Sequence, residues 1–251
     1  MRRFAASLHN ELAKLAAQPR TRGFLLAALL LPLGFMLLSA RLSSGTGLAS
    51  LLGGDPYLTL LGGYTAVVLP LFLCLTAAEQ FAGEGEAGTI RLSLVRPVSR
   101  GKIYGAKVLA AALYTGLQLL LVAAVCLLCG WLLPGSSPAG ALGAAPAAKA
   151  ALAAWAAMLT VGVVYAALAQ LAGRTATAIA LCLLVYGGAK LLPLLLPELS
   201  VWSLFSYTGW HTLWLGDGLP GARLWNLSAL LLSYCIIAYT SGLVVFSKKS
   251  F

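Results

Sequence analysis

Six long apolar runs, separated by short segments that hold most of the charges, dominate this sequence of 251 residues. The runs cover residues 23–40, 57–78, 108–133, 150–173, 175–197 and 224–247. A helix needs about 20 apolar residues to cross the hydrocarbon core of a bilayer. Backbone amides in lipid must be satisfied within the segment, so each run is expected to be helical. The sequence therefore predicts an all-α polytopic membrane protein with six transmembrane helices.

The composition supports a membrane rather than an aqueous environment. Only 10% of the residues are charged, whereas soluble domains carry about 25%. The net charge of +10 comes from short basic patches between the apolar runs, a pattern that suits anionic lipid headgroups better than nucleic acid. The two histidines, His9 and His211, are far apart, and the five cysteines lie inside apolar runs. We therefore expect membrane lipid as a partner, no nucleic acid, and no metal site.

The distribution of basic residues predicts the orientation. If the N-terminus is inside, 13 of the 17 lysines and arginines lie on the inner side. The other four are Arg41, Lys149, Lys190 and Arg223. The positive-inside rule then places both termini of this multi-pass protein in the cytoplasm. Arg174 stands alone between the fourth and fifth runs, which indicates a tight inner turn; the alternative is one long kinked helix and only five spans.

Residues 1–22 are predicted to form a cytoplasmic amphipathic helix that connects to the transmembrane domain, residues 23–251. Leu8, Leu12 and Leu15 share one helical stripe with Phe4. A basic, half-apolar helix before a span is typical of a segment on the inner leaflet. Pro19 would end it. The residues assigned to this helix are Leu8, Glu11, Leu12, Lys14 and Leu15.

The longest inner loop, residues 79–107, is unusually rich in charge. Glu84 and Glu86 precede residues 89–96, for which Thr89 is a suitable helix cap and Pro97 a stop. Alternation of apolar residues also leaves a strand open, and an ordinary solvated loop is equally compatible with the composition. Ser99 could cap a helix that continues into the third span. For Glu79 the interpretations are pairing with Arg22 or Lys107, or solvation.

The run from Glu84 to Arg100 resembles the cytoplasmic loop of type-two ATP-binding-cassette (ABC) exporter permeases, or ABC-2-like membrane proteins. That family shows G-E-x-E-x-G-T, then a short amphipathic stretch ending near a proline, a basic residue and a helix into the third span. The N-terminal "ELAKL" segment, the six spans and the apolar segment before the last span also match. The resemblance thus extends over nearly the whole chain.

The resemblance implies a permease subunit that pairs with a second copy of itself and with separate ABC ATPase subunits. The inner loop would carry a short coupling helix that docks on the ATPase, and residues 1–22 would be the elbow helix. The sequence contains no G-x-x-x-x-G-K-[ST], so ATP and Mg²⁺ are expected in the partner and the chain is not itself expected to be an enzyme. The residues assigned to coupling are Glu84, Glu86, Gly88, Thr89, Ile90, Arg91, Leu92, Leu94, Arg96, Pro97 and Arg100.

Residues 198–223 form an aromatic segment with few charges, expected at the outer interface as a re-entrant hairpin. Lys190, within the fifth run, either extends its ammonium group to that interface or lines a substrate path. The residues assigned to a path or outer gate are Lys190, Trp202, Phe205, Trp210 and Trp214. The alternative function is a stand-alone secondary transporter or channel. Such proteins place several polar groups within the membrane, and here the spans offer mainly Lys190, Gln118 and Gln170. A membrane-embedded enzyme would need clustered acids or histidines, which the sequence does not offer.

Overall fold

The computed structural model describes residues 2–45, 55–88, 99–132, 143–196, 198, 203–215 and 221–248. Within these ranges the chain forms helices and no strand. Six helices are long and apolar enough to cross a membrane: Pro19–Arg41, Pro56–Glu86, Arg100–Leu132, Ala144–Ala169, Thr175–Leu194 and Leu224–Lys248. The prediction of an all-α protein with six spans is confirmed. Two separate helices flank Arg174, so the five-span alternative is wrong.

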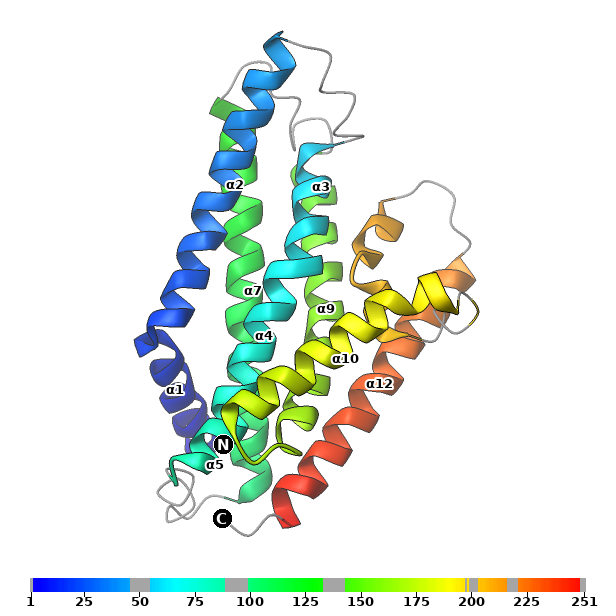
Figure 1. The fold of residues 1–251 in the computed structure, drawn as a ribbon. Coiled ribbons are helices and arrows are strands. Elements are labelled where there is room, and N and C mark those ends of the chain that lie inside the picture. The colour runs from blue at the N-terminus through cyan, green and yellow to red at the C-terminus, as the bar shows by residue number, and fades with distance from the viewer. Residues whose placement is uncertain are drawn as a thin grey trace.

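The helices follow one another up and down the bundle (Figure 1). In chain order they are α1 (Arg2–Ala17), α2 (Pro19–Gly45), α3 (Pro56–Gly63), η2 (Tyr64–Val68), α4 (Leu69–Ala77), η3 (Ala78–Gly83), α5 (Glu84–Glu86), α7 (Arg100–Leu132), α9 (Ala144–Ala169), α10 (Thr175–Leu195), η4 (Leu204–Tyr207), η5 (Trp210–Trp214) and α12 (Gly221–Lys248). The elements from α3 to α5 form one continuous second span. The start of α1 and the end of α12 lie at the same end of the bundle, here called the base (Figure 1).

The second, third and fourth spans form the core of the bundle. Between 39% and 50% of their most apolar windows is buried, against 11% to 22% in the first, fifth and sixth spans. Close contact between α7 and α9 depends on Gly116, because a Cβ there would come within 3.0 Å of the indole nitrogen of Trp155. That nitrogen donates a hydrogen bond of 2.9 Å to the carbonyl of Ala112. A small residue thus lets a large one pack across two spans.

Prolines mark two changes in the helices. α1 ends at Ala17 and α2 begins at Pro19, as the sequence predicts for a residue that cannot continue a helix. In the second span, Pro70 has no N–H to donate to the carbonyl of Ala66, four residues earlier. The hydroxyl of Tyr186 on α10 donates to that carbonyl instead. The break in the backbone pattern therefore links the second span to the fifth.

The second span contains two π-helical turns, η2 and η3. The helix continues past its predicted end at Ala78 to Glu86, and η3 lies in this extension. A π-turn places one extra residue in the helix and shifts the register of everything after it. Because η3 directly precedes Glu84, it determines the direction in which this carboxylate leaves the second span.

Candidate functional site

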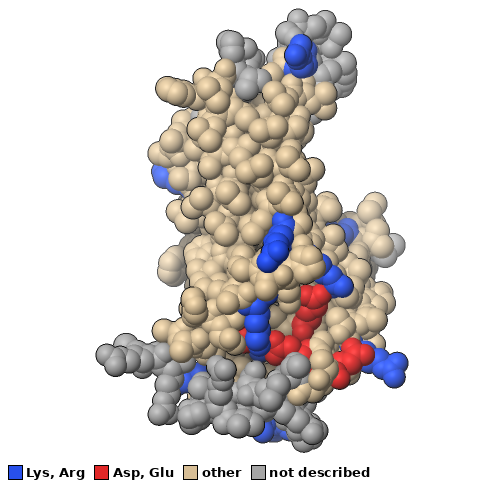
Figure 2. All heavy atoms as spheres, turned by 90° about the vertical axis from the view of Figure 1, so that its left-hand side faces the viewer, with Lys and Arg blue, Asp and Glu red and all other residues tan. Residues whose placement is uncertain are grey.

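Charged side chains gather at the base on the face formed by α1 and α2 (Figure 2). Acidic and basic side chains lie together there, whereas most of the surface above them is uncharged. Five ion-pair contacts lie in this region; the acids are Glu11, Glu79 and Glu84 and the bases are Lys14, Arg20 and Lys107. The chemistry of the described base is therefore that of paired charges rather than of a pocket.

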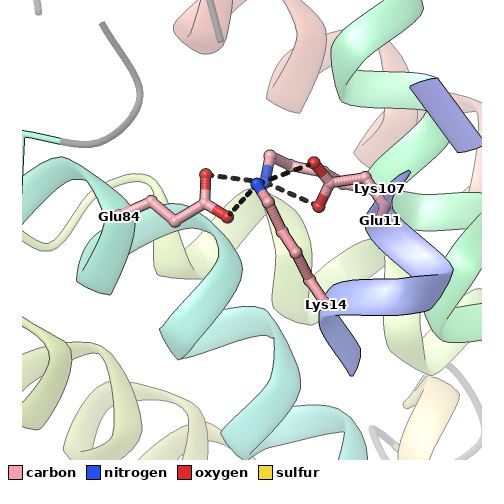
Figure 3. Close-up of polar contacts among 4 residues, drawn as sticks. All are labelled: Glu11, Lys14, Glu84 and Lys107. Carbon is pink, nitrogen blue, oxygen red and sulfur yellow. Dashed lines mark hydrogen bonds and ion pairs between the residues drawn. The ribbon is translucent and has the colours of Figure 1, made fainter. Parts of the chain in front are cut away.

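Four of these residues, from three elements, form a ring (Figure 3). Lys107 of α7 contacts Glu11 of α1 at 3.0 Å and Glu84 of α5 at 2.8 Å. Lys14 contacts the same two carboxylates at 3.2 Å each, through their other oxygens. Two lysines thus bridge two glutamates, and the ring is neutral. We call these four residues the base cluster.

The base cluster is largely removed from solvent. The side chains of Lys107 and Glu11 are only 1% and 4% exposed. A buried charge is tolerated only when it is paired, so Lys107 depends on both glutamates, whereas the Lys14 side chain is 39% exposed. Burial lowers the pKa of Lys14, but the carboxylates of Glu84 and Glu11 outweigh it and the pKa is raised. The cluster therefore joins the N-terminal helix to both ends of the 79–107 loop.

Glu86 connects the same loop to the fifth span. One of its carboxylate oxygens accepts hydrogen bonds of 3.0 Å from the backbone N–H and from the hydroxyl of Thr175. Thr175 is the first residue of α10, and Arg174 before it makes no side-chain capping bond. A carboxylate at this position satisfies an unpaired amide and favours the helix dipole. Glu86 therefore caps α10 from another span.

Gly88 and Arg100 mark the points where the described chain leaves and re-enters the bundle. Gly88 has a φ of +67°, a left-handed conformation that suits glycine and ends the helix. Ser99 accepts backbone hydrogen bonds from Lys102 and Ile103, so α7 begins where the sequence predicts. Arg100 donates a hydrogen bond of 2.7 Å to the carbonyl of Ser247 near the end of α12. The start of α7 is thus hydrogen-bonded to the end of α12, the sixth span.

Glu79 has a different partner from those considered in the sequence. It pairs with Arg20 of α2, while Lys107 is occupied by the base cluster. Arg22 donates instead to the carbonyl of Ala16, 2.9 Å away. The interpretation that paired Glu79 with Arg22 or Lys107 is wrong, because the extended helix and η3 carry Glu84, not Glu79, towards α7.

The predicted coupling residues fall into two groups. Glu84, Glu86, Gly88 and Arg100 lie at the stem of the loop and have the contacts given above. The others lie outside the described residues: Thr89, Ile90, Arg91, Leu92, Leu94, Arg96 and Pro97. The structure thus bonds three stem positions, Glu84, Glu86 and Arg100, to other elements, and the helix expected between the two ends of the stem stays a prediction.

The apolar stripe of α1 packs towards the bundle. Leu15 is buried, and Leu8 and Leu12 are partly buried. Tyr114 of α7 donates a hydrogen bond of 3.2 Å to the carbonyl of Leu12. Glu11 lies on this same inward side and reaches the base cluster. The acid that interrupts the stripe in the sequence is therefore the residue that joins α1 to the spans.

At the opposite end of the bundle, η4 and η5 fold back onto α9 and α10. Phe205 packs against the rings of Tyr165 and Tyr186, with centroids 5.9 Å and 5.4 Å away. Trp210 donates to the carbonyl of Ala153 at 2.6 Å and contacts the ring of Trp214. Trp202 lies outside the described residues. The aromatic segment is therefore a packed cover over α9 and α10, and its depth in the membrane stays a prediction.

Lys190 joins the aromatic segment to α10. Its ammonium group donates a hydrogen bond of 2.8 Å to the hydroxyl of Thr208 and lies 5.6 Å from the centre of the Tyr186 ring. Tyr186 lies one turn before Lys190 on α10 and Thr208 lies in the aromatic segment, so the choice between an interfacial lysine and a substrate path stays a prediction. Gln118 and Gln170 are buried, and Gln118 accepts a hydrogen bond of 3.1 Å from Tyr64.

Comparison with known families agrees with this architecture. The sequence model described as "ABC-2 family transporter protein" matches residues 7–190. The chain belongs to the ABC-2 transporter family. The match covers most of α1, the first four spans, the loop stem and most of α10, and therefore includes the whole base cluster. No curated protein matched the chain.

This ABC-2 family protein is thus a membrane subunit of an ABC transporter. The resemblance seen in the sequence identified the family and the region of the loop, but it did not find the base cluster. One signal was available: a carboxylate on an apolar helical stripe must find a buried cation, and Lys107 follows Ile103, Tyr104 and Ala106 at the start of a span. The positions of the helices relative to one another were needed to pair them.

Proposed function

We propose that this chain works as a homodimer in the cell membrane, with cytoplasmic termini, and uses ATP hydrolysis by a separate ABC ATPase subunit to export a substrate. ATP and Mg²⁺ would bind to that subunit. ABC-2 membrane subunits generally work with such an ATPase, which supports the partner. The excess of basic residues on the side of the termini supports the orientation.

The observation that carries the proposal is the attachment of the loop stem to three other elements. Glu84 and Lys107 join it to α1, Glu86 joins it to α10, and Arg100 joins it to α12. Force applied to residues 89–98 would therefore reach α1 and the fifth and sixth spans, α10 and α12, at once. A solvated loop without a mechanical role would need none of these contacts.

The strength of the attachments differs in a way that suits transmission of movement. The base cluster is buried and charge-paired, so separating its members would leave unpaired charges in a poorly hydrated site. It would keep α1, α5 and α7 together as one body. The contacts of Glu86 and Arg100 are more exposed and can change at lower energy. We infer that the loop moves with α1 and α7 and alters the tilt of α10 and α12.

In this proposal the export route runs between two copies of the chain. Six spans arranged around a packed core leave little room for a path inside one bundle. α2 and α10 are among the least buried spans, with 22% and 11% of their windows buried, and are available to face a second copy. Cysteine cross-linking along α10, for example at Leu184 or Leu191, would detect that interface.

Docking can be tested with the loop variant Arg91→Glu, using the purified chain and its ATPase subunit. We expect co-purification of the ATPase to be lost, because the variant reverses a charge in the segment expected to contact the ATPase. The matched control is Lys102→Glu, which changes an exposed lysine on α7, outside residues 89–98. Undiminished binding and ATP hydrolysis in Arg91→Glu would reject this docking site, and substrate flux in liposomes that lack any ATPase would reject the proposed function.

Coupling can be separated from docking with Glu86→Gln. This variant keeps the size of the side chain but weakens the charge-assisted hydrogen bonds to Thr175. We expect the ATPase to bind normally while transport per ATP hydrolysed falls severalfold. Unchanged transport would show that the link between the loop and α10 has no part in coupling.

A further inference from the structure

A groove of about 530 Å³ lies between α9, η5 and α12, away from the base. α9 and α12 lie close together near the base and diverge towards the far end, with η5 between them (Figure 1). Its volume falls in the range of sites that hold small molecules, about 300–1,000 Å³. The contacts described above for the loop and for Lys190 are not part of this groove.

The walls of the groove are largely apolar and offer a ligand few hydrogen-bonding groups. They include Leu152, Ala156 and Leu159 of α9 and Leu231 and Leu232 of α12. Three of the polar groups that line it are hydrogen-bonded within the protein. Ser228 donates to the carbonyl of Leu224 at 2.7 Å, Thr160 donates to that of Ala156 at 3.3 Å, and the Trp210 indole donates to that of Ala153. Such a surface suits a hydrocarbon chain and not a polar solute.

One cation stands at the rim. Lys149 lines the groove near the start of α9, is exposed, and takes part in none of the ion pairs of the described chain. From Lys149 to Leu159 is ten residues of α9, or roughly 15 Å at 1.5 Å per residue. One leaflet contributes about half of a hydrocarbon core roughly 30 Å thick. The groove is thus about as long as one leaflet is thick, and its positive charge stands at the end nearer the start of α9.

We propose that this groove binds an anionic phospholipid, with one acyl chain along α9 and the phosphate paired with Lys149. The charge at the rim selects the headgroup, and the apolar walls hold the chain. Ala153 and Ala156 supply the space, because a larger side chain at either position would fill the groove. The lipid would hold α12 and η5 apart from α9 at the far end. This site is independent of the ATPase and of the proposed function.

Brominated lipids test the proposal, because bromine on an acyl chain quenches nearby tryptophans and Trp214 lines the groove. The protein is placed in bilayers with a low fraction of brominated phosphatidylglycerol or, in parallel, brominated phosphatidylcholine. The Trp214 signal is the difference between wild type and Trp214→Phe. We expect saturable quenching with about a fivefold preference for phosphatidylglycerol, as one lysine near the surface contributes.

Variants on the two halves of the site make the test decisive. Lys149→Gln should abolish the headgroup preference and keep the folded bundle, while Ala156→Phe should reduce quenching by both lipids. The matched control is Arg41→Gln, which removes another cation from the same end and should keep the preference. Equal quenching by both lipids in wild type, or a preference that survives Lys149→Gln, would overturn the site. If the lipid is released during ATP turnover, it is transported cargo, and the proposal of a lipid that stays bound would be overturned.

Discussion

Replacing Lys107 by methionine removes the cation that joins α1, α5 and α7. At separations near 3 Å and an effective dielectric constant of about 20, each of its two contacts contributes roughly 5 kcal/mol of attraction. Desolvation of the ions offsets much of that energy. The variant leaves Glu11 and Glu84 with only Lys14 to balance them. Loss of one member of a buried pair usually costs about 3–5 kcal/mol, and we expect that loss in the free energy of unfolding.

The free energy can be measured by unfolding in mixed detergent micelles, followed by tryptophan fluorescence. Lys102→Met is the matched control, because this lysine is exposed on the same helix, and it should change stability by less than about 0.5 kcal/mol. Glu11→Gln in the Lys107→Met background restores neutrality. The double variant should therefore lose about 1–3 kcal/mol less than the sum of the single variants.

A Lys107→Met protein as stable as the Lys102→Met protein would refute the reasoning. It would mean that the base is hydrated enough for the carboxylates to stand without the lysine. Strict additivity in the double variant would refute the direct pairing of Lys107 with Glu11, even if the single variant is unstable.

Three further outcomes follow from the packing. Burial lowers the pKa of His211 from 6.5 to about 4, so the unfolded chain binds more protons than the folded chain below pH 6.5. When the pH is lowered from 7.5 to 5, the unfolding free energy of the wild type should fall by roughly 2 kcal/mol for this reason. The His211→Phe variant should not show that fall. Gly242→Ala should destabilise by about 1–3 kcal/mol, because the new methyl group overlaps the hydroxyl of Tyr104, and Tyr104→Phe in the same chain should recover part of the loss in Tm. Arg20→Gln should change the unfolding free energy by less than about 1 kcal/mol, because its pair with Glu79 is exposed, and a larger loss would show that this pair is shielded from water.

The sequence predicted the spans well because each is a long local signal. Apolar length, the proline at position 19 and the serine at position 99 act on the backbone near them, so the ends of α1 and the start of α7 follow directly. The second span is the exception. Its π-turns and its continuation to Glu86 have no marker in composition, because a shift of one residue in hydrogen bonding depends on what the helix packs against.

The sequence by itself determined the environment of this protein, its six helices and its family, since hydrophobicity and a contiguous motif are properties of neighbouring residues. Only the tertiary structure decided which charges meet. Lys107 and Glu11 are 96 positions apart, and an ion pair depends on distance and burial, which arise when separate helices pack. The groove beside Lys149 has the same origin, because it exists only where α9 and α12 diverge around η5.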